Sequence, residues 1–386
     1  MKIIIAPDSF KGSLDAIGVA AAIEKGIKTA FSTAETVLLP IGDGGEGTME
    51  TLVAATGGKI KKMVVRGPLN NPVEAAYGIL GDGKTCVIEM ASASGLHLVS
   101  EEELSPLKAT TFGTGELIRQ ALNDGFTSFI IGIGGSATND GGAGMLQALG
   151  LKILDDSGES LGLGGGELNK ASTLDFGTFD KRISKSRFII ASDVQNPLTG
   201  PEGASHIFGP QKGASSEEVE LLDRNLAKWA DEILKVTGIA LHDRPGAGAA
   251  GGIGGAFQAF FPAEMKRGVD VVLDYIKLDE HLKCADLVIT GEGRVDHQTA
   301  FGKTPLGVAQ RAAGKNVPTI ILAGSVGHGT EVLHDFGVVS IHSIINRPMT
   351  LQESMENAAE LLEQSAEQIV RTYFFQHIHE KGRLFV

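Results

Sequence analysis

The sequence has no basic tract, and its net charge is −13. A nucleic-acid-binding protein needs a stripe of lysine and arginine to neutralise phosphates, so the composition argues against nucleic acid as a partner. Cysteine is scarce. Cys86 and Cys284 form no CxxC pair, which is typical of structural thiols in a reducing compartment.

Long hydrophobic runs are missing as well. The start, Met1-Lys-Ile-Ile-Ile-Ala-Pro7, has an apolar run too short for a secretory signal. No run reaches the ~18 residues that a membrane span requires. We therefore expect a cytoplasmic protein with no membrane partner. The histidines include no HExxH pair, so no zinc-hydrolase motif is present.

Short apolar runs followed by glycine-rich loops and helical segments dominate the chain. Non-alternating, β-branched runs are typical of parallel strands covered on both faces. Capping boxes predict helices that begin after Ser215 and Thr350. The second helix is expected to bury Met355, Ala359, Leu362, Ala366 and Ile369. The clearest strand candidates are 3–6, 37–41, 129–133, 188–191, 287–289 and 319–323.

One stretch breaks this alternation. Segments 62–66, 73–80 and 85–91 read as consecutive strands joined by tight turns, which favours antiparallel pairing. We therefore expect an α/β fold with two domains. The first is a Rossmann-like parallel-sheet domain built from 1–65 and 285–386. The second is an inserted α/β domain with a mixed sheet, from 66–284.

The segment Gly78-Ile-Leu-Gly-Asp-Gly-Lys-Thr85 fits the phosphate-loop pattern GxxxxGK[ST]. That motif works only where a helix follows the threonine directly. Here the next residues, 86–90, read as another strand. We therefore reject the phosphate-loop interpretation and predict a hairpin turn.

Acidic residues follow four of the predicted strands. They are Asp8, Asp43, Asp193 and Glu292. Ligands of open α/β sheets collect at the carboxyl ends of the strands, so four acids in separate loops favour a shared site over four unrelated turn residues.

Two of the loops add further polar chemistry. Pro7-Asp-Ser-Phe-Lys-Gly-Ser13 precedes a predicted helix at about 14–28, whose first amides could hold an anion with Lys11 beside it. Gly42-Asp-Gly-Gly-Glu-Gly-Thr48 frees the backbone to approach a ligand, and its two acids suit a Mg²⁺ ion between protein and phosphate.

The segment Gly132-Ile-Gly-Gly-Ser-Ala-Thr-Asn-Asp-Gly-Gly-Ala-Gly144 follows a predicted strand. It offers backbone N–H groups and the hydroxyls of Ser136 and Thr138 to phosphates. It also satisfies the loose dinucleotide fingerprint, which is weak evidence in a chain with 52 glycines. An NAD(P)-dependent oxidoreductase of a small hydroxy acid therefore stays an alternative.

Taken together, these segments resemble the type-1 glycerate kinase family. Four later segments carry the resemblance further, in the same order along the chain. They are Ser192-Asp-Val-Gln-Asn-Pro-Leu-Thr-Gly200, Phe208-Gly-Pro-Gln-Lys-Gly-Ala214, Pro245-Gly-Ala-Gly-Ala-Ala-Gly-Gly252 and Ile289-Thr-Gly-Glu-Gly-Arg-Val-Asp296. The resemblance implies ATP-dependent phosphorylation of (R)-glycerate, with Mg²⁺, in a cleft between the two domains. It favours 2-phosphoglycerate as product, with 3-phosphoglycerate as the alternative.

Roles follow from what phosphoryl transfer needs, which is positioning and charge neutralisation. We assign the base to Asp193, with Asp8 as alternate base or metal ligand. Lys11 is the third catalytic candidate, as a cation for the transferred phosphate or the substrate carboxylate. Asp43, Glu46 and Glu292 are the expected metal ligands. The expected substrate ligands are Ser9, Arg66, Lys212, Arg294 and Asp296, and the expected nucleotide ligands are Gly134, Gly135, Ser136, Ala137, Thr138 and Asp140.

Other readings stay open from sequence. They are a non-catalytic nucleotide or sugar-acid binding protein, and a kinase for a larger aldonate. The sequence does not decide the oligomeric state, and a homodimer is one expectation.

Overall fold

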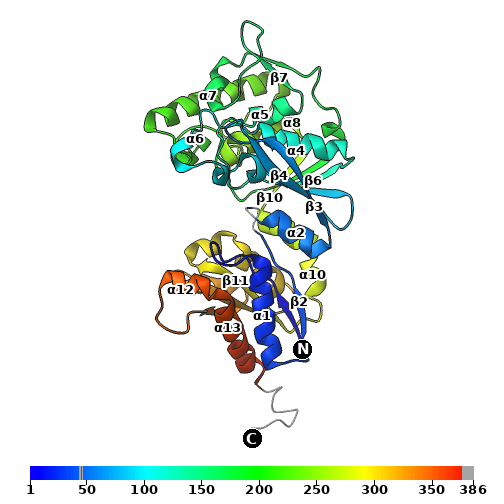
Figure 1. Ribbon diagram of the computed structural model, residues 1–386, viewed down its shortest axis with the longest axis vertical. Coiled ribbons are helices and arrows are strands. Elements are labelled where there is room, and N and C mark those ends of the chain that lie inside the picture. The colour runs from blue at the N-terminus through cyan, green and yellow to red at the C-terminus, as the bar shows by residue number, and fades with distance from the viewer. Residues whose placement is uncertain (43–44, 46, 376–386) are drawn as a thin grey trace. The chain divides into compact units, whose positions relative to one another are not determined.

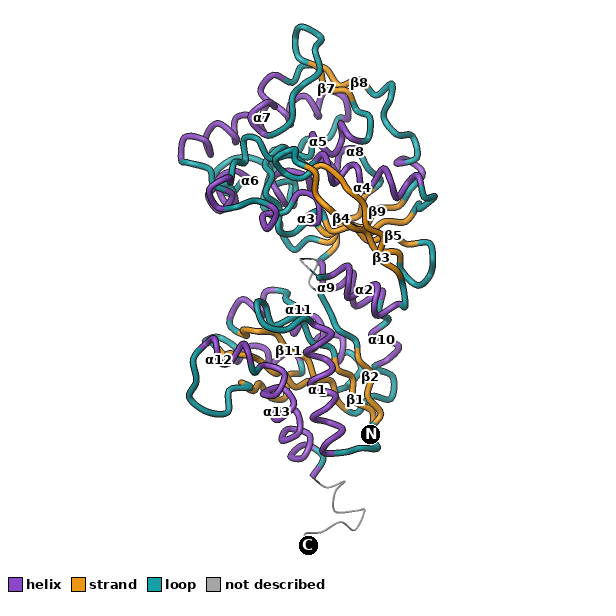
Figure 2. Tube along the Cα trace, in the orientation of Figure 1, coloured by secondary structure: helices purple, strands orange, loops and turns teal. Residues whose placement is uncertain are grey.

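The computed structural model describes residues 1–42, 45 and 47–375 (Figures 1 and 2). Contacts between Cα atoms divide the chain into unit 1, residues 1–43 with 272–386, and unit 2, residues 44–271. The sequence analysis set these boundaries near 66 and 284 instead. The N-terminal boundary of unit 2 falls before 66 because β3 (Lys59–Arg66) pairs antiparallel with β4 (Pro72–Ile79) over its whole length.

Unit 1 contains a five-stranded sheet in the order β13-β12-β11-β1-β2, and every pair in it is parallel. Ile3 and Ile5 of β1 pack with α1 and α13 on one face of the sheet. Ile321 of β12 faces α11 on the other. The parallel domain predicted from sequence is therefore confirmed. Its elements are β1 (Lys2–Ile5), α1 (Ala16–Ala30), β2 (Glu35–Leu38), α10 (Leu278–His281), β11 (Leu287–Val295), α11 (Thr304–Ala313), β12 (Thr319–Val326), β13 (Val338–Ser343), α12 (Leu351–Glu356) and α13 (Ala358–Tyr373).

Unit 2 contains a mixed six-stranded sheet in the order β10-β9-β6-β5-β4-β3. The first four strands are parallel, and β4 and β3 continue the sheet antiparallel, as predicted. Its other elements are α2 (Thr48–Thr56), β5 (Thr85–Glu89), α3 (Ala91–Ser94), α4 (Phe112–Asn123), β6 (Ser128–Gly132), α5 (Ala143–Ala148), β7 (Lys152–Leu154), β8 (Thr173–Asp175), β9 (Arg187–Ala191), α6 (Ala204–Phe208), α7 (Ser216–Thr237), α8 (Ile253–Phe260) and β10 (Ala263–Lys266), with α9 (Gly268–Tyr275) at the boundary to unit 1.

Aromatic side chains organise the core of unit 2. Phe129 of β6 and Phe188 of β9 stack with their ring centroids 4.6 Å apart, and Phe261 meets Phe188 edge-on. Trp229 of α7 is fully buried and donates from Nε1 to the backbone oxygen of Gly141 at 3.0 Å. The indole therefore anchors α7 to the loop between β6 and α5.

The rejected phosphate-loop match lies in the hairpin between β4 and β5. Asp82 accepts hydrogen bonds from the backbone nitrogens of Lys84 and Thr85, which closes the turn. Thr85 begins β5, and no helix follows it. The prediction of a hairpin turn is confirmed.

The two capping boxes are also confirmed, but one helix prediction was partly wrong. Thr350 caps α12, which then ends at Glu356, and α13 begins two residues later. This break at Asn357 shifts the helical register, so Ala358 is buried where Ala359 was expected. Leu362, Ala366 and Ile369 are buried as predicted.

The glycine motif 245–252 serves close backbone packing. A Cβ atom on Gly251, whose φ is +69°, would lie 2.0 Å from the backbone oxygen of Thr138. The backbone oxygen of Gly251 accepts from the nitrogen of Gly141. This segment therefore supports the loop at 134–140 from behind. No helix among the described residues is both long enough and apolar enough to cross a membrane.

Candidate active site

Two predicted acids of unit 1 are positioned by neighbouring strands. Asp8 follows β1, and Glu292 lies inside β11, which pairs with β1. The sequence analysis ended this strand at 289, before Glu292. The structure extends it to Val295 because β11 keeps parallel pairing with β12 through that residue. Both acids line one pocket.

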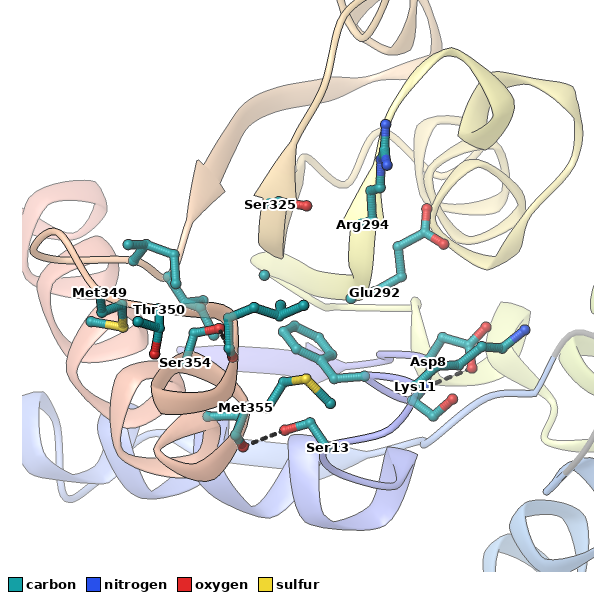
Figure 3. Close-up of a pocket in the computed structure, with 18 of the residues that line it drawn as sticks. Asp8, Lys11, Ser13, Glu292, Arg294, Ser325, Met349, Thr350, Ser354 and Met355 are labelled. Carbon is teal, nitrogen blue, oxygen red and sulfur yellow. Dashed lines mark hydrogen bonds between the residues drawn. The ribbon is translucent and has the colours of Figure 1, made fainter.

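The pocket of unit 1 has a volume of about 570 Å³ and opens at the carboxyl ends of β1, β11 and β12. Figure 3 shows the charged side chains of Asp8, Lys11, Glu292 and Arg294 together on one side of it. The sequence predicted one shared site for the strand-end acids, with Lys11 and Arg294 as its cations. Ser9 lines the same pocket.

Hydrogen bonds hold both carboxylates in place. Asp8 accepts from the backbone nitrogen of Ser9 at 2.6 Å and from Thr304 Oγ1 at 2.8 Å. Glu292 accepts from Thr299 Oγ1 at 2.6 Å. Burial raises the pKa of Glu292, and the nearby charge of Asp8 adds to the rise.

These two carboxylates fit a divalent cation. Hard cations such as Mg²⁺ take oxygen ligands, often from one or two carboxylates with phosphate oxygens completing the shell. A cation would also relieve the repulsion that contributes to the raised pKa of Glu292. Within the part of the chain that the structure describes, no cluster of three or more Asp, Glu, His or Cys is spaced for a metal. Asp43 and Glu46, the other expected ligands, lie outside the described residues.

Three cations border the same carboxylates. Lys11 is exposed, and Arg294 is exposed with its Nε 3.0 Å from Asp296 Oδ2. Lys303 lies with its Nζ 3.5 Å from Glu292 Oε2, and the sequence analysis missed it. The sequence feature that could have revealed Lys303 is the Gly-Lys-Thr-Pro segment at the start of α11, in which the lysine directly precedes the first helical residue.

Asp296, expected to bind substrate, has a local structural role. Its carboxylate accepts from the backbone nitrogen of Gln298 and caps the short helix His297–Phe301. This capping, with the Arg294 charge, lowers its pKa. It does not line the pocket of unit 1.

In unit 2, the loop at 134–140 encloses a buried lysine. Lys212 is 1% exposed, and its Nζ donates to Ser136 Oγ at 2.8 Å and to the backbone oxygen of Thr138 at 2.6 Å. Burial lowers the pKa of Lys212 to about 7. Thr138 Oγ1 is buried without a hydrogen-bond partner in the structure. Gly134 and Gly135 are exposed and Ala137 is buried.

Asp140 organises this loop from inside. It is fully buried and accepts from the backbone nitrogens of Thr111, Gly142 and Gly144, and from Thr111 Oγ1. Its burial raises its pKa. The carboxylate therefore fixes the start of α5 to the start of α4.

Two more predicted residues lie at strand ends of unit 2. Asp193 is exposed after β9, and its Oδ1 accepts from the backbone nitrogen of Gly268 at 3.2 Å. Arg66 ends β3, where its guanidinium stacks over the ring of Phe112 at 4.3 Å.

The sequence analysis also missed Glu89. This residue ends β5 and is 8% exposed, and its Oε1 accepts from the backbone nitrogen of Met49 at 2.7 Å. The N–H groups of Gly47 and Thr48 also donate to it, so Glu89 caps α2 at the end of the glycine-rich loop 42–48. Burial raises its pKa to about 7. It lines a second pocket, of about 450 Å³.

Comparison with known proteins decides the family. Residues 3–374 match the model of the glycerate kinase family. The chain is 50% identical to the glycerate kinase of Bacillus subtilis over 96% of its own length and 97% of that protein. It is 49% identical to the glycerate 2-kinase of Escherichia coli over 96% and 98%. The chain belongs to the glycerate kinase family.

A solved structure agrees with this membership. The crystal structure of a protein assigned as glycerate kinase 2 from Salmonella typhimurium LT2 matches with a TM-score of 0.89 and 47% identity, covering 98% of this chain and 99% of that one. This glycerate kinase family member is therefore a kinase, a phosphotransferase acting on a hydroxyl group. The resemblance inferred from sequence is confirmed.

This family member also contains one segment with the spacing of a serine-hydrolase motif. Gly158-Glu-Ser-Leu-Gly162 fits the GxSxG pattern of a nucleophile elbow. That motif requires a strand followed by a sharp turn into a helix. Here Ser160 is exposed and forms a bridge with Leu154 beside the β7–β8 hairpin. The segment is a surface turn.

Proposed function

We propose that this protein transfers the γ-phosphoryl group of ATP to a hydroxyl of (R)-glycerate and releases mainly 2-phosphoglycerate. The observation that carries the proposal is the pocket of unit 1, whose lining includes two acids, Asp8 and Glu292, and three cations, Lys11, Arg294 and Lys303. Two acids and three cations suit a phosphate chain with its metal. The relative from Escherichia coli, named a glycerate 2-kinase, supports the choice of the 2-hydroxyl.

In this proposal, Asp8 and Glu292 would hold Mg²⁺, which would neutralise charge on the donor phosphates. The hydroxyl groups of Thr304 and Thr299 fix the two carboxylates through the hydrogen bonds described above. Lys11, Arg294 and Lys303 are cations that approach the transferred phosphoryl group and stabilise the charge that develops on it.

In unit 2, Asp193 acts as the general base that takes the proton from the acceptor hydroxyl. Its exposure at the end of β9 leaves the carboxylate accessible to a ligand. A base within hydrogen-bond reach of an attacking hydroxyl typically contributes ~10²–10⁴-fold in rate.

The loop at 134–140 binds an anionic phosphate through backbone amides other than that of Ala137, which donates to Ser94, with Lys212 beneath the loop. A buried lysine with a depressed pKa regains its charge when an anion binds nearby, so ligand and proton bind together. The unpartnered hydroxyl of Thr138 is available as a donor at the same place. The predicted interdomain cleft, the cytoplasmic location and the homodimer stay predictions.

Steady-state ADP release tests the proposal. The protein, Mg²⁺, ATP and (R)-glycerate should together give continuous ADP release, and omission of any one component should abolish it. The same protein with NAD⁺ or NADP⁺ and glycerate should give no change in nicotinamide absorbance. Nicotinamide reduction without ADP release would favour the oxidoreductase alternative and contradict the proposal.

A further inference from the structure

The pocket of unit 1 is larger and more apolar than the acceptor requires. Its volume of about 570 Å³ falls within the range of ~300–1,000 Å³ in which proteins bury ligands of drug size. Glycerate is a three-carbon acid with oxygen on every carbon, so it has no apolar face to bury. The charged side of the pocket suffices for the phosphates and the metal, and the apolar side needs another occupant.

The apolar side is built by one continuous segment. It runs from the end of β13 through α12 into α13 and contributes Ile344, Met349, Leu351, Met355 and Ala358. Figure 3 shows Met349 on the side of the pocket away from Asp8 and Lys11, and Met355 between that side and the loop that carries Ser13. Leu351 is 76% exposed, so its side chain is free to cover a ligand.

The chemistry of this side suits a flat aromatic ring. Methionine side chains are flexible and polarisable, and their sulfur atoms contact aromatic rings favourably at about 5 Å. Phe10 adds an aromatic ring to the pocket lining, at the base of the β1–α1 loop. A purine presents two apolar faces and a polar edge, which matches thioethers and leucine around it with Ser325 and Ser354 at the margin.

A hydrogen bond ties the apolar and charged sides together. Ser13 Oγ donates to the backbone oxygen of Met355 at 2.6 Å. At Gly12, a Cβ atom would lie 3.0 Å from Met355 Cε, so α12 packs closely on the loop that carries Asp8 and Lys11. The pocket therefore has an apolar end held at a fixed place beside a phosphate-binding end, which is the layout a nucleotide needs.

We propose that the apolar end of this pocket, formed by Met349, Leu351 and Met355, binds the nucleobase of the phosphoryl donor. The inference rests on the proposed function, since it takes ATP as the donor. The proposed nucleobase site does not include the loop at 134–140, whose predicted role is to bind phosphate. Sequence motifs did not point to this segment, because it contains no glycine cluster and no strand-end acid.

Polar, uncharged variants test the assignment without changing the electrostatics of the phosphate site. Leu351→Gln and Met349→Gln replace apolar surface with an uncharged amide; glutamine matches methionine in length and exceeds leucine by one atom. Val339→Gln is the matched control, because Val339 lies on β13 of the same unit, is 50% exposed and does not line the pocket. Isothermal titration calorimetry of the whole protein measures affinity for Mg-ATP and for Mg-tripolyphosphate, which keeps the phosphate chain of the donor without the ribose and the nucleobase.

We expect wild-type protein to bind Mg-ATP more tightly than Mg-tripolyphosphate. Each pocket variant should weaken Mg-ATP binding by roughly 5- to 20-fold, as the loss of partial burial of one apolar side chain predicts. Affinity for tripolyphosphate and the KM for glycerate should stay within about twofold. The control variant should match the wild type.

Three results would overturn the assignment. In the first, both pocket variants keep the ATP affinity and the melting temperature of the wild type. In the second, the wild type binds ATP and tripolyphosphate equally well. In the third, the variants lose affinity for glycerate and keep their affinity for ATP. Failure of the proposed function has a different signature. In that case the wild-type protein would release no ADP from ATP in the presence of glycerate, whatever the variants bind.

Discussion

The ammonium group of Lys212 lies 2.8 Å from the hydroxyl oxygen of Ser136, in a site that excludes solvent almost completely. Lys212→Met should reduce kcat/KM by at least about 100-fold. The loop at 134–140 would lose the amine that donates to Ser136 and to the backbone oxygen of Thr138. The melting temperature should stay equal or rise, since an apolar isostere removes the cost of burying an amine.

Steady-state kinetics and thermal melting of Lys212→Met check this together. Lys185→Met, at an exposed site in unit 2, is the control. A variant with near-normal activity and a lowered melting temperature would show that Lys212 serves stability alone.

Asp193 provides the second prediction. Asp193→Asn keeps the shape of the side chain and its capacity to accept from Gly268, but removes the basicity that proton abstraction needs. We expect kcat to fall by ~10²–10⁴-fold with little change in the KM for ATP. Rapid-quench or coupled assays measure this, with the exposed Asp243→Asn as control. Turnover within a few-fold of wild type would exclude Asp193 as the base.

Glu292 provides a prediction about the metal. Glu292→Gln retains the hydrogen bond from Thr299 and removes one negative charge from the pair with Asp8. The Mg²⁺ concentration for half-maximal activity should rise at least about tenfold, because Mg²⁺ binds carboxylate oxygens far better than amide oxygens. Glu331→Gln, exposed in the same unit, should leave the Mg²⁺ curve unchanged. If Glu292→Gln also left it unchanged, Glu292 would not be a ligand.

Glu89 predicts a pH dependence of stability. Burial raises its pKa to about 7 from an ordinary 4.5, so the folded protein keeps this proton over a range where the unfolded chain has lost it. The stability that Glu89 contributes is therefore complete below pH 4.5 and is lost as pH rises through 7, by ~1.4 kcal/mol per pH unit.

Urea unfolding at pH 5 and pH 7 measures this contribution. Between those values the wild type should lose about 2–3 kcal/mol relative to Glu89→Gln, which has no proton to lose. A free-energy difference between the two proteins that is independent of pH would contradict the raised pKa.

Local patterns sufficed for much of the fold. The capping box at Ser215 and the antiparallel run of β3, β4 and β5 were predicted, because caps and hairpins depend on residues near one another in sequence. Asp8 and Glu292 were predicted to meet because carboxyl ends of parallel strands share one edge of a sheet.

Other features depend on contacts between distant segments and carry no local signal. Glu89 reads as an ordinary strand residue, and its role as a cap for α2 requires knowing that β5 ends beneath that helix. Lys303 reaches Glu292 only because α11 begins beside β11. The break at Asn357 separates α12 from α13, whose apolar residues share a core cluster with α1, and it altered which alanine is buried.

The most direct test of the account is the identity of the phosphorylated product. Protein, ATP, Mg²⁺ and (R)-glycerate are incubated together, and phosphorus NMR identifies the phosphorylated product. We predict a new phosphomonoester signal that matches 2-phosphoglycerate, with ADP formed in equal amount. Consumption of no ATP, or phosphate appearing only as the inorganic ion, would contradict phosphoryl transfer to glycerate.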